Sequence, residues 1–356
     1  MTLRVAALTS GLHTPSSRFR IRQHIAPLVK HGIEVREFKP FVEESVDNVL
    51  LPLRPEGVRI RQMPPLYPVY GALLALRVAA RMPGVAASWH SDVTWLERGL
   101  CAGWPTLEKQ LRKPLVLDVD DAVWLAEPLG GTQMRRAAER ADVVVVCNSY
   151  LADWFGQYCT RIEMVPTAVD AEVFVPAPKK ERSPYIVGWT GVRANYRYVE
   201  AIRPALARFL AHAPDARLRI VADAPPPHWD LPADSVEFIQ WSEQNEIASV
   251  QSMDVGIMPL LDTEWTRGKC GFKAIQYMAC GVPVIASPVG MNVELLQRGV
   301  GLAASTEQQW LDALIFLYEH SEDARRIGAL GRTIFLERYS LAAATSQLAR
   351  IFKSLR

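Results

Sequence analysis

Short apolar runs alternate with longer amphipathic stretches along the whole chain. In the first half, the runs typical of strands are residues 4–8, 115–117 and 143–146, and residues 20–31 have helical spacing. In the second half, the corresponding runs are residues 185–187, 218–221, 236–239, 255–259 and 284–286, and residues 199–211 have helical spacing. Because strands separated by helices belong to parallel sheets, the pattern predicts an α/β fold with one parallel sheet in each half.

A segment rich in proline and charge separates the two halves. Residues 174–184 read F-V-P-A-P-K-K-E-R-S-P, a composition typical of a linker. A chain of 356 residues is also longer than one hydrophobic core usually supports. We therefore predict a first domain at residues 1–173 and a second domain that begins at residue 185.

Residues 267–294 predict a short helix followed directly by a buried strand. Phe272, Ile275 and Met278 recur at helical spacing, and Gly281 and Pro283 end the helix. The run V-I-A at residues 284–286 is apolar on both faces, as in a parallel strand that helices cover. Ligands gather at the carboxyl ends of such strands, so this element predicts a binding site beside residues 287–290.

The start of this helix carries cations where unpaired amides already make the field positive. Arg267, Lys269 and Lys273 are expected there, and a bound anion would relieve their repulsion from the helix dipole. A diphosphate fits best, held by the backbone amides of Cys270, Gly271 and Phe272. The alternative is a solvated basic turn screened by Glu264.

Composition and charge limit the function classes. Hydrophobic residues make up 49% and charged residues 22% of the chain, as in a soluble globular protein. The net charge is +2, but residues 1–113 hold 16 Lys and Arg against 9 Asp and Glu, an excess of +7. The five cysteines form no C-x-x-C pair and there is no signal-like segment, so we expect a reducing cytoplasm.

Four motifs fall at the ends of predicted strands. They are P-S-S-R-F-R at residues 15–20, D-V-D-D at 118–121, G-W-T-G at 188–191, and M-A-C-G-V-P-V-I-A-S at 278–287 with Gly290 and Glu294 after it. In these motifs the chain resembles the retaining family 4 glycosyltransferases of GT-B fold, over essentially its whole length. The resemblance implies two facing Rossmann-like domains with parallel sheets and a cleft between them. It also implies a second domain at residues 185–338 and a last helix, within residues 339–356, that crosses back to the first domain.

The resemblance implies a nucleotide-sugar donor, held mainly by the second domain, and a saccharide or lipid-linked acceptor, held mainly by the first. Two glutamates of the family pattern are absent. The ribose position falls on Gln276, and the position for the donor sugar falls near Gly268 or Lys269. Gln276 can still hydrogen-bond a ribose, so Gln276→Glu is expected to be tolerated or to tighten that contact. A histidine of the family pattern is replaced by Asp120.

Charge stabilisation of the leaving diphosphate is the main task of such a site. We predict that Lys269, Arg193 and Lys273 contact the diphosphate, with amides near Gly191, Gly11 and Ser17. Arg18 and Arg20 are candidates for holding a phosphate or carboxylate. The alternatives are a solvated loop cation at Arg193 and simple helix capping by Ser16 and Ser17.

Asp120 and Asp121 follow a strand and are the candidates for binding sugar hydroxyls or for accepting the acceptor's proton. The spacing Asp118-x-Asp120 also occurs in metal-dependent glycosyltransferases of another fold, but three residues are a weak motif, and neither a metal nor a resident cofactor is expected. Trp241 and Ser242 follow the strand at residues 236–239, where the resemblance implies contacts with the base; their alternative is plain packing.

The longest apolar stretch, residues 66–76, ends at Arg77 and by itself is too short to span a bilayer. With Arg77 and Arg81 at one end, residues 67–82 are a candidate for peripheral contact with an anionic membrane; a buried helix is the alternative. No nucleic-acid partner is predicted.

The motifs favour a cytoplasmic retaining glycosyltransferase of cell-surface polysaccharide or glycolipid biosynthesis. A non-catalytic or weakly active protein that binds sugar nucleotides is the alternative, because both family glutamates are absent. A nicotinamide dehydrogenase is disfavoured, since no G-x-G-x-x-G follows a strand.

Overall fold

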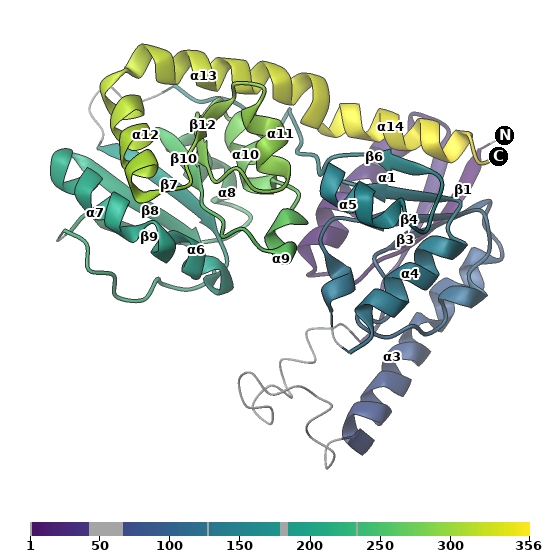
Figure 1. Ribbon diagram of the computed structural model, residues 1–356. Helices are drawn as coiled ribbons and strands as arrows, with labels where there is room; N and C mark the ends of the chain where they lie inside the picture. The colour runs from purple at the N-terminus through teal and green to yellow at the C-terminus, as the bar shows by residue number, and fades with distance from the viewer. Residues whose placement is uncertain (1, 43–66, 127, 179–183, 233) are drawn as a thin grey trace. The chain divides into compact units, whose positions relative to one another are not determined.

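The computed structural model describes residues 2–42, 67–126, 128–178, 184–232 and 234–356 (Figure 1). Its internal contacts divide the chain into two compact units. Unit 1 comprises Met1–Thr167 together with Ala344–Arg356, and unit 2 comprises Ala168–Ala343. Each unit contains one six-stranded sheet in which all described pairs are parallel, so the predicted α/β fold is confirmed.

Unit 1 has the strand order β2-β1-β3-β4-β5-β6. The strands are β1 (Leu3–Leu8), β2 (Ile33–Phe38), β3 (Val93–Glu97), β4 (Leu115–Val119), β5 (Val143–Val146) and β6 (Ile162–Met164). β5 reads V-V-V-V and every residue of it is buried, as expected for a strand covered by helices on both faces. The order reverses at β1, whose neighbours are β2 and β3.

The helices of unit 1 begin with a π-helical turn, η1 (Ser17–Arg22), which continues into α1 (Gln23–Val29), in place of the single helix predicted at residues 20–31. The others are α3 (Tyr67–Ser88), η6 (Glu108–Gln110), η7 (Val123–Leu125), α4 (Gly130–Arg140), α5 (Ser149–Phe155) and α14 (Leu341–Lys353). The end of α14 packs within unit 1: the Phe352 ring lies 5.0 Å from that of Trp95, and His24 Nδ1 lies 2.8 Å from Thr345 Oγ1.

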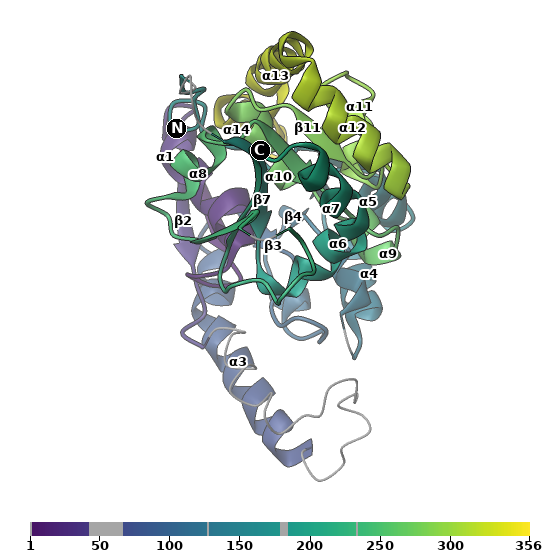
Figure 2. The same cartoon turned by 90° about the vertical axis from the view of Figure 1, so that its left-hand side faces the viewer.

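Helix α3 is 22 residues long and continues well past Arg77, so the apolar segment is longer than the sequence analysis expected. By length and composition Pro68–Ser88 meets the criteria for a membrane span, with mean hydropathy 1.2 and 22% of the window buried. Its second half, however, packs into unit 1. Val85 is buried, and Arg81 is buried with its guanidinium donating to the carbonyl of Thr9. In both views the first half of α3 extends beyond the other elements of unit 1 (Figure 2).

Unit 2 has the strand order β12-β11-β10-β7-β8-β9, which reverses at β7. The strands are β7 (Tyr185–Gly191), β8 (Ala216–Ala222), β9 (Val236–Gln240), β10 (Val255–Met258), β11 (Val284–Ala286) and β12 (Gly301–Ala303). β11 has the bounds that the sequence predicts.

The helices of unit 2 are η8 (Arg193–Asn195), α6 (Tyr196–Ala201), α7 (Arg203–His212), α8 (Glu246–Gln251), α9 (Glu264–Arg267), α10 (Phe272–Ala279), α11 (Met291–Leu296), α12 (Glu307–Glu319), α13 (Ser321–Ile334) and η9 (Phe335–Tyr339). One helix was predicted at residues 199–211, but the chain forms two. Ile202 leaves the helical region with φ −106° and ψ 8°, and Pro204 fits the first turn of the helix that follows.

Candidate functional site

Both sheets have a point where the strand order reverses, and in open α/β sheets ligands bind in the crevice at the carboxyl ends of the strands beside such a point. In unit 2 this point lies between β7 and β10, and in unit 1 between β1 and β3. We call the ends of β7 and β10 the unit 2 rim and the ends of β1 and β3 the unit 1 rim, each with the loops beside it. Most of the residues that the sequence singled out lie at or beside these two rims.

At the unit 2 rim, the indole ring of Trp189 in β7 lies against the side chain of a residue in the first turn of α10. Lys273 Nζ lies 5.5 Å from the ring centroid of Trp189. A Cβ atom at Gly191 would lie 2.4 Å from the same ring, so only glycine fits there. The hydroxyl of Tyr277 accepts a hydrogen bond of 3.2 Å from the amide of Thr190. The structure therefore brings Gly191 and Lys273 together, as the sequence indicates.

The start of α10 is formed by a glycine in the left-handed region. Gly271 has φ +67°, and a Cβ atom there would lie 2.9 Å from the side chain of Met291. Such a residue turns the chain so that the amides of the first helical turn, from Phe272 on, face outward from the helix end. Cys270 precedes this turn and is half-buried.

The three cations expected at this helix start have different surroundings. Lys273 lies in the first turn of α10, and Lys269 Nζ lies 5.4 Å from the ring centroid of Trp265. Arg267 is instead the last residue of α9, and its guanidinium donates to both carboxylate oxygens of Asp262 at 2.6 and 3.0 Å. Asp262 is therefore a countercharge for Arg267 beside the Glu264 considered as a screen.

Arg193 lies just after β7, but its contact is with a carboxylate at the end of β8. Its amide and Nε donate to Asp223 at 2.6 and 3.1 Å. Burial opposes a low pKa for Asp223, but these hydrogen bonds outweigh it and the pKa is lowered. The Arg193 side chain is 68% exposed, so this surface pair can open at small cost.

Gln276 is buried in contact with a carboxylate that the sequence analysis missed. Its Nε2 donates to Glu246 Oε1 at 2.9 Å, and the two residues are 3% and 7% exposed. Glu246 begins α8, directly after the turn that contains Trp241 and Ser242. The Trp241 amide donates to the carbonyl of Ala222 at the end of β8, and the Ser242 amide donates to Asn245 within the turn, so both N–H groups have partners.

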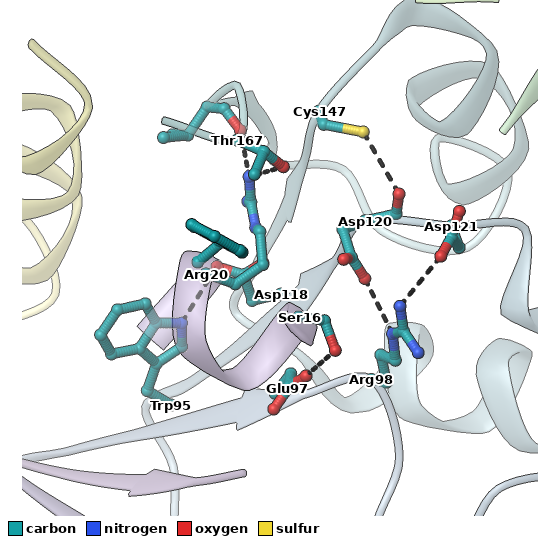
Figure 3. A network of polar contacts seen from close by, with 12 residues as sticks. Ser16, Arg20, Trp95, Glu97, Arg98, Asp118, Asp120, Asp121, Cys147 and Thr167 are labelled. Carbon is teal, nitrogen blue, oxygen red and sulfur yellow. Dashed lines mark hydrogen bonds and ion pairs between the residues drawn. The ribbon is translucent and has the colours of Figure 1, made fainter. Parts of the chain in front are cut away.

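At the unit 1 rim, the buried carboxylate of Glu97 binds the turn after β1 (Figure 3). Glu97 is 1% exposed and accepts from the amide of Ser10 at 2.9 Å and from Ser17 Oγ at 2.6 Å. The hydroxyl of Ser16 also donates to it. Burial raises the pKa of Glu97, and the charge of Arg98 and these hydroxyls oppose the shift.

The Gly11 amide, which was expected to bind phosphate in this turn, already has a partner. Ser17 Oγ accepts from the amides of Ser10 and Gly11 at 3.1 and 3.3 Å. Gly11 and Ser17 therefore lie together, as the sequence suggests, but they face Glu97. Neither Ser16 nor Ser17 caps the helix through its side chain. The guanidinium of Arg18 lies 4.7 Å from the ring centroid of Phe19.

A single guanidinium holds Asp120 and Asp121. Arg98 Nε donates to Asp120 at 2.8 Å, and Arg98 Nη2 donates to Asp121 at 3.0 Å (Figure 3). Both carboxylates can also accept a hydrogen bond from a sugar hydroxyl. Asp121 is the more accessible, with its side chain 22% exposed against 9% for Asp120.

Asp118 belongs to a separate buried pair. It accepts from Arg20 Nε at 2.7 Å and from Trp95 Nε1 at 3.2 Å, and burial raises its pKa. Because Asp118 and Asp120 are committed to different arginines, they do not form a joint chelating site. No cluster of three or more histidine, cysteine or acidic side chains suited to a metal ion occurs in the described part of the chain.

The topology defines the class of protein: an α/β protein built from two units, each with one parallel sheet whose strand order reverses once. Residues 185–320 match the family model described as "Glycosyl transferases group 1". The sucrose-phosphate synthase of Thermosynechococcus elongatus is similar in fold, with a TM-score of 0.71 at 18% identity and 99% of each chain covered. The structure of Anabaena HepE in complex with UDP-glucose is similar at a TM-score of 0.67 and 16% identity, covering 99% of this chain and 100% of that one.

Among curated proteins, the chain is 26% identical over 263 residues to a GDP-mannose-dependent monoacylated α-(1-6)-phosphatidylinositol monomannoside mannosyltransferase of Corynebacterium glutamicum. That alignment covers 65% of this chain and 67% of the mannosyltransferase. Two further relatives align over 46% and 38% of their own lengths. The chain is therefore a glycosyltransferase of the GT-B class, as its motifs predict.

Proposed function

We propose that the protein is a retaining, family 4 glycosyltransferase that takes a sugar from a nucleoside-diphosphate sugar. Its acceptor is a saccharide or a lipid-linked sugar in cell-surface polysaccharide or glycolipid synthesis. The observation that carries the proposal is the start of α10, where Gly271 is left-handed and Lys269 and Lys273 lie at the same helix end. Support also comes from the UDP-glucose complex of Anabaena HepE and from the GDP-mannose dependence that the Corynebacterium relative's name records.

In this proposal the diphosphate lies against the first turn of α10. The amides of Phe272 and Lys273 point at its oxygens, and the two lysines balance the charge that develops as the sugar leaves. Arg193 joins them when its surface pair with Asp223 opens. The residues supply this charge stabilisation themselves, so the proposed mechanism uses no metal.

The ribose lies beside Gln276. Its Nε2 is held by Glu246, which fixes the amide orientation and leaves Oε1 to accept from a ribose hydroxyl. The unit 1 rim holds the acceptor, where Asp121 accepts a hydrogen bond from one of its hydroxyls.

Thermal shift tests the donor site directly, because a ligand that binds only the native state raises its melting temperature. The chain is screened against UDP, GDP, ADP, CMP and their sugars. One nucleoside diphosphate and the corresponding sugar nucleotide should raise the melting temperature. When bacterial saccharide or lipid extract is added, that sugar nucleotide should be converted to its nucleoside diphosphate. If none of them raises the melting temperature, the proposal is wrong.

The pairing of Asp120 and Asp121 with Arg98 favours a second candidate, a binding protein with little or no transfer activity, because both carboxylates already accept hydrogen bonds from a guanidinium. A nucleotide that raises the melting temperature but is never released from its sugar, with or without extract, supports this second candidate.

We propose a cytoplasmic location with peripheral contact to an anionic membrane through the first half of α3. Val69 and Leu76 are 46% and 47% exposed there, and the described part of α3 contains no acidic residue. Flotation with vesicles that contain anionic lipid should decrease for Val69→Glu/Leu76→Glu. Leu336→Glu is the matched control, because Leu336 is 46% exposed in unit 2. Equal flotation of all three proteins contradicts this location.

A further inference from the structure

Two adjacent residues at the end of β3 face opposite ways and hold the two neighbouring loops of the unit 1 rim. β3 lies between β1 and β4 in the sheet. Glu97, its last residue, binds the turn after β1, whereas Arg98 binds the loop after β4 (Figure 3). Neither residue was singled out by the sequence analysis.

The backbone at this point has an uncommon conformation. Arg98 has φ +56°, a left-handed value that costs a residue with a side chain about 1–3 kcal/mol. Its amide donates to the carbonyl of Asp118 at 2.8 Å, which fixes this turn to β4. A Cβ atom at the next residue, Gly99, would lie 2.3 Å from Gln133 Nε2. The surroundings therefore enforce the turn that directs the two side chains to opposite loops.

The hydrogen bonds around Glu97 fix the direction of each donor. Ser17 Oγ accepts from two amides, so its hydrogen points to Glu97. Glu97 thus accepts from Ser10, Ser16 and Ser17 at once, which an ionised carboxylate does and a primary amide does not. This makes the shape of the turn dependent on a carboxylate at residue 97.

The second half of the arrangement sets the direction of the acidic side chains. Arg98 uses Nε for one carboxylate and Nη2 for the other, a geometry that a planar guanidinium provides and a lysine ammonium does not. The orientation of Asp121, the more exposed of the two acids, therefore depends on Arg98.

We propose that Glu97 and Arg98 are positioning residues, which together fix the two loops of the unit 1 rim and so orient its groups toward the sugar acceptor. We call them the Glu97–Arg98 clamp. This inference rests on the proposed function for the role of the rim, but the clamp itself can be tested without any substrate.

Hydrogen–deuterium exchange tests the clamp in the full-length protein. Glu97→Gln should speed exchange of the amides in residues 9–18 and leave residues 120–126 unchanged. Arg98→Lys should do the reverse. Two substitutions are the matched controls and should change neither segment: Glu34→Gln, at an exposed carboxylate on β2, and Arg135→Lys, at an exposed partner of Glu139. If Glu97→Gln does not fold, Ser17→Ala removes part of the same network and should affect residues 9–18.

The kinetic test separates positioning from a general structural role. The donor is UDP-glucose or GDP-mannose, and the measured quantity is the concentration of acceptor extract that gives half-maximal release of the nucleoside diphosphate. This concentration should rise about 10- to 100-fold in both clamp variants, because a small misplacement of reacting groups has effects of this size. The dissociation constant for UDP or GDP should stay within about twofold of wild type, because that site lies in unit 2. Unchanged exchange in both segments overturns the clamp, and so does a matching loss of nucleotide affinity. If the wild type releases no nucleoside diphosphate but the exchange pattern is as expected, the proposed function is wrong and the structural role of the clamp is still supported.

Discussion

The two rims place charge in opposite ways. At the unit 1 rim and beneath it, two arginines are matched by buried or half-buried carboxylates: Arg20 by Asp118, and Arg98 by Asp120 and Asp121. At the unit 2 rim, Lys269 and Lys273 lie over the faces of aromatic rings. A ring face stabilises a cation by about 0.5–1 kcal/mol at an exposed site, whereas breaking a buried ion pair costs about 3–5 kcal/mol. The second rim is thus suited to bind an anion, and the first to hold fixed acceptors for hydroxyl groups.

The difference has a physical cause in where each charge is buried. A buried arginine must be paired, because an unpaired buried charge costs several kcal/mol. Lys269 and Lys273 are only partly buried, so a ligand can reach part of each side chain. The four predictions below test this contrast, from the largest expected effect to the smallest.

Gln276→Glu should replace an amide–carboxylate hydrogen bond beneath the unit 2 rim with two facing carboxylates. The new carboxylate would face Glu246 at the 2.9 Å separation that now joins an amide to a carboxylate. Two buried carboxylates at that distance cannot both ionise, so we expect unfolding free energy to fall by about 3 kcal/mol at pH 8 and by less at pH 5. The structure therefore reverses the sequence-based expectation that this substitution is tolerated.

Gln308→Glu is the matched control for that measurement by chemical denaturation. Gln308 Nε2 also donates to a carboxylate, Asp312 at 2.6 Å, but both groups are exposed, so little change is expected. A Gln276→Glu variant as stable as this control would show that the Glu246 pair is not buried as described.

Lys269→Ala combined with Lys273→Ala should remove the charge that the unit 2 rim offers to an anion. Hydrogen bonds to charged groups contribute about 1.5–3 kcal/mol each, so affinity for the nucleoside diphosphate should fall at least about tenfold. Calorimetry with UDP and GDP measures it. Arg267→Ala is the control, because Asp262 already pairs with that nearby cation. Equal affinities in the double variant and in wild type would remove both lysines from the site.

The pH dependence of the unfolding free energy tests the effect of burial on a titratable group of unit 1, His24. Burial, with the charge of Arg20, lowers the pKa of His24 to about 3 from an ordinary 6.5, so the folded protein keeps it neutral while the unfolded chain takes up a proton. Stability from this group is present above pH 6.5 and is lost as pH falls toward 3, by at most about 1.4 kcal/mol per pH unit.

Comparison of wild type with His24→Gln isolates this contribution, because glutamine can keep a hydrogen bond to Thr345 and does not titrate. Denaturation curves at several pH values should show wild type losing stability relative to the variant between about pH 6 and pH 3. Parallel curves would mean that His24 is protonated in the folded state.

Much of the fold could be predicted because a strand that is buried on both faces is a continuous apolar run in the sequence. β5 and β11 have the bounds predicted for them. The strands that were missed carry other signals. β2 reads I-E-V-R-E-F with charged residues between apolar ones, and β3 ends in Glu97. At the rims, Gly271 could be predicted because the left-handed residue before α10 favours glycine. The partners Glu97, Arg98 and Glu246 could not, because their roles depend on residues up to 87 positions away in the chain.

The smallest effect concerns Arg193, whose guanidinium pairs with the carboxylate of Asp223. If Arg193 contacts the diphosphate, its pair with Asp223 competes with the ligand, and Asp223→Asn should tighten binding of UDP or GDP. Exposed pairs are worth about 0–1 kcal/mol, so the gain is at most about fivefold. Asp262→Asn, which releases Arg267 in the same way, should leave the affinity unchanged, since Arg267 belongs to the preceding helix. A gain in both variants would mean that general surface charge attracts the nucleotide; a gain in Asp223→Asn alone would place Arg193 at the phosphates and make the unit 2 rim a site of three cations.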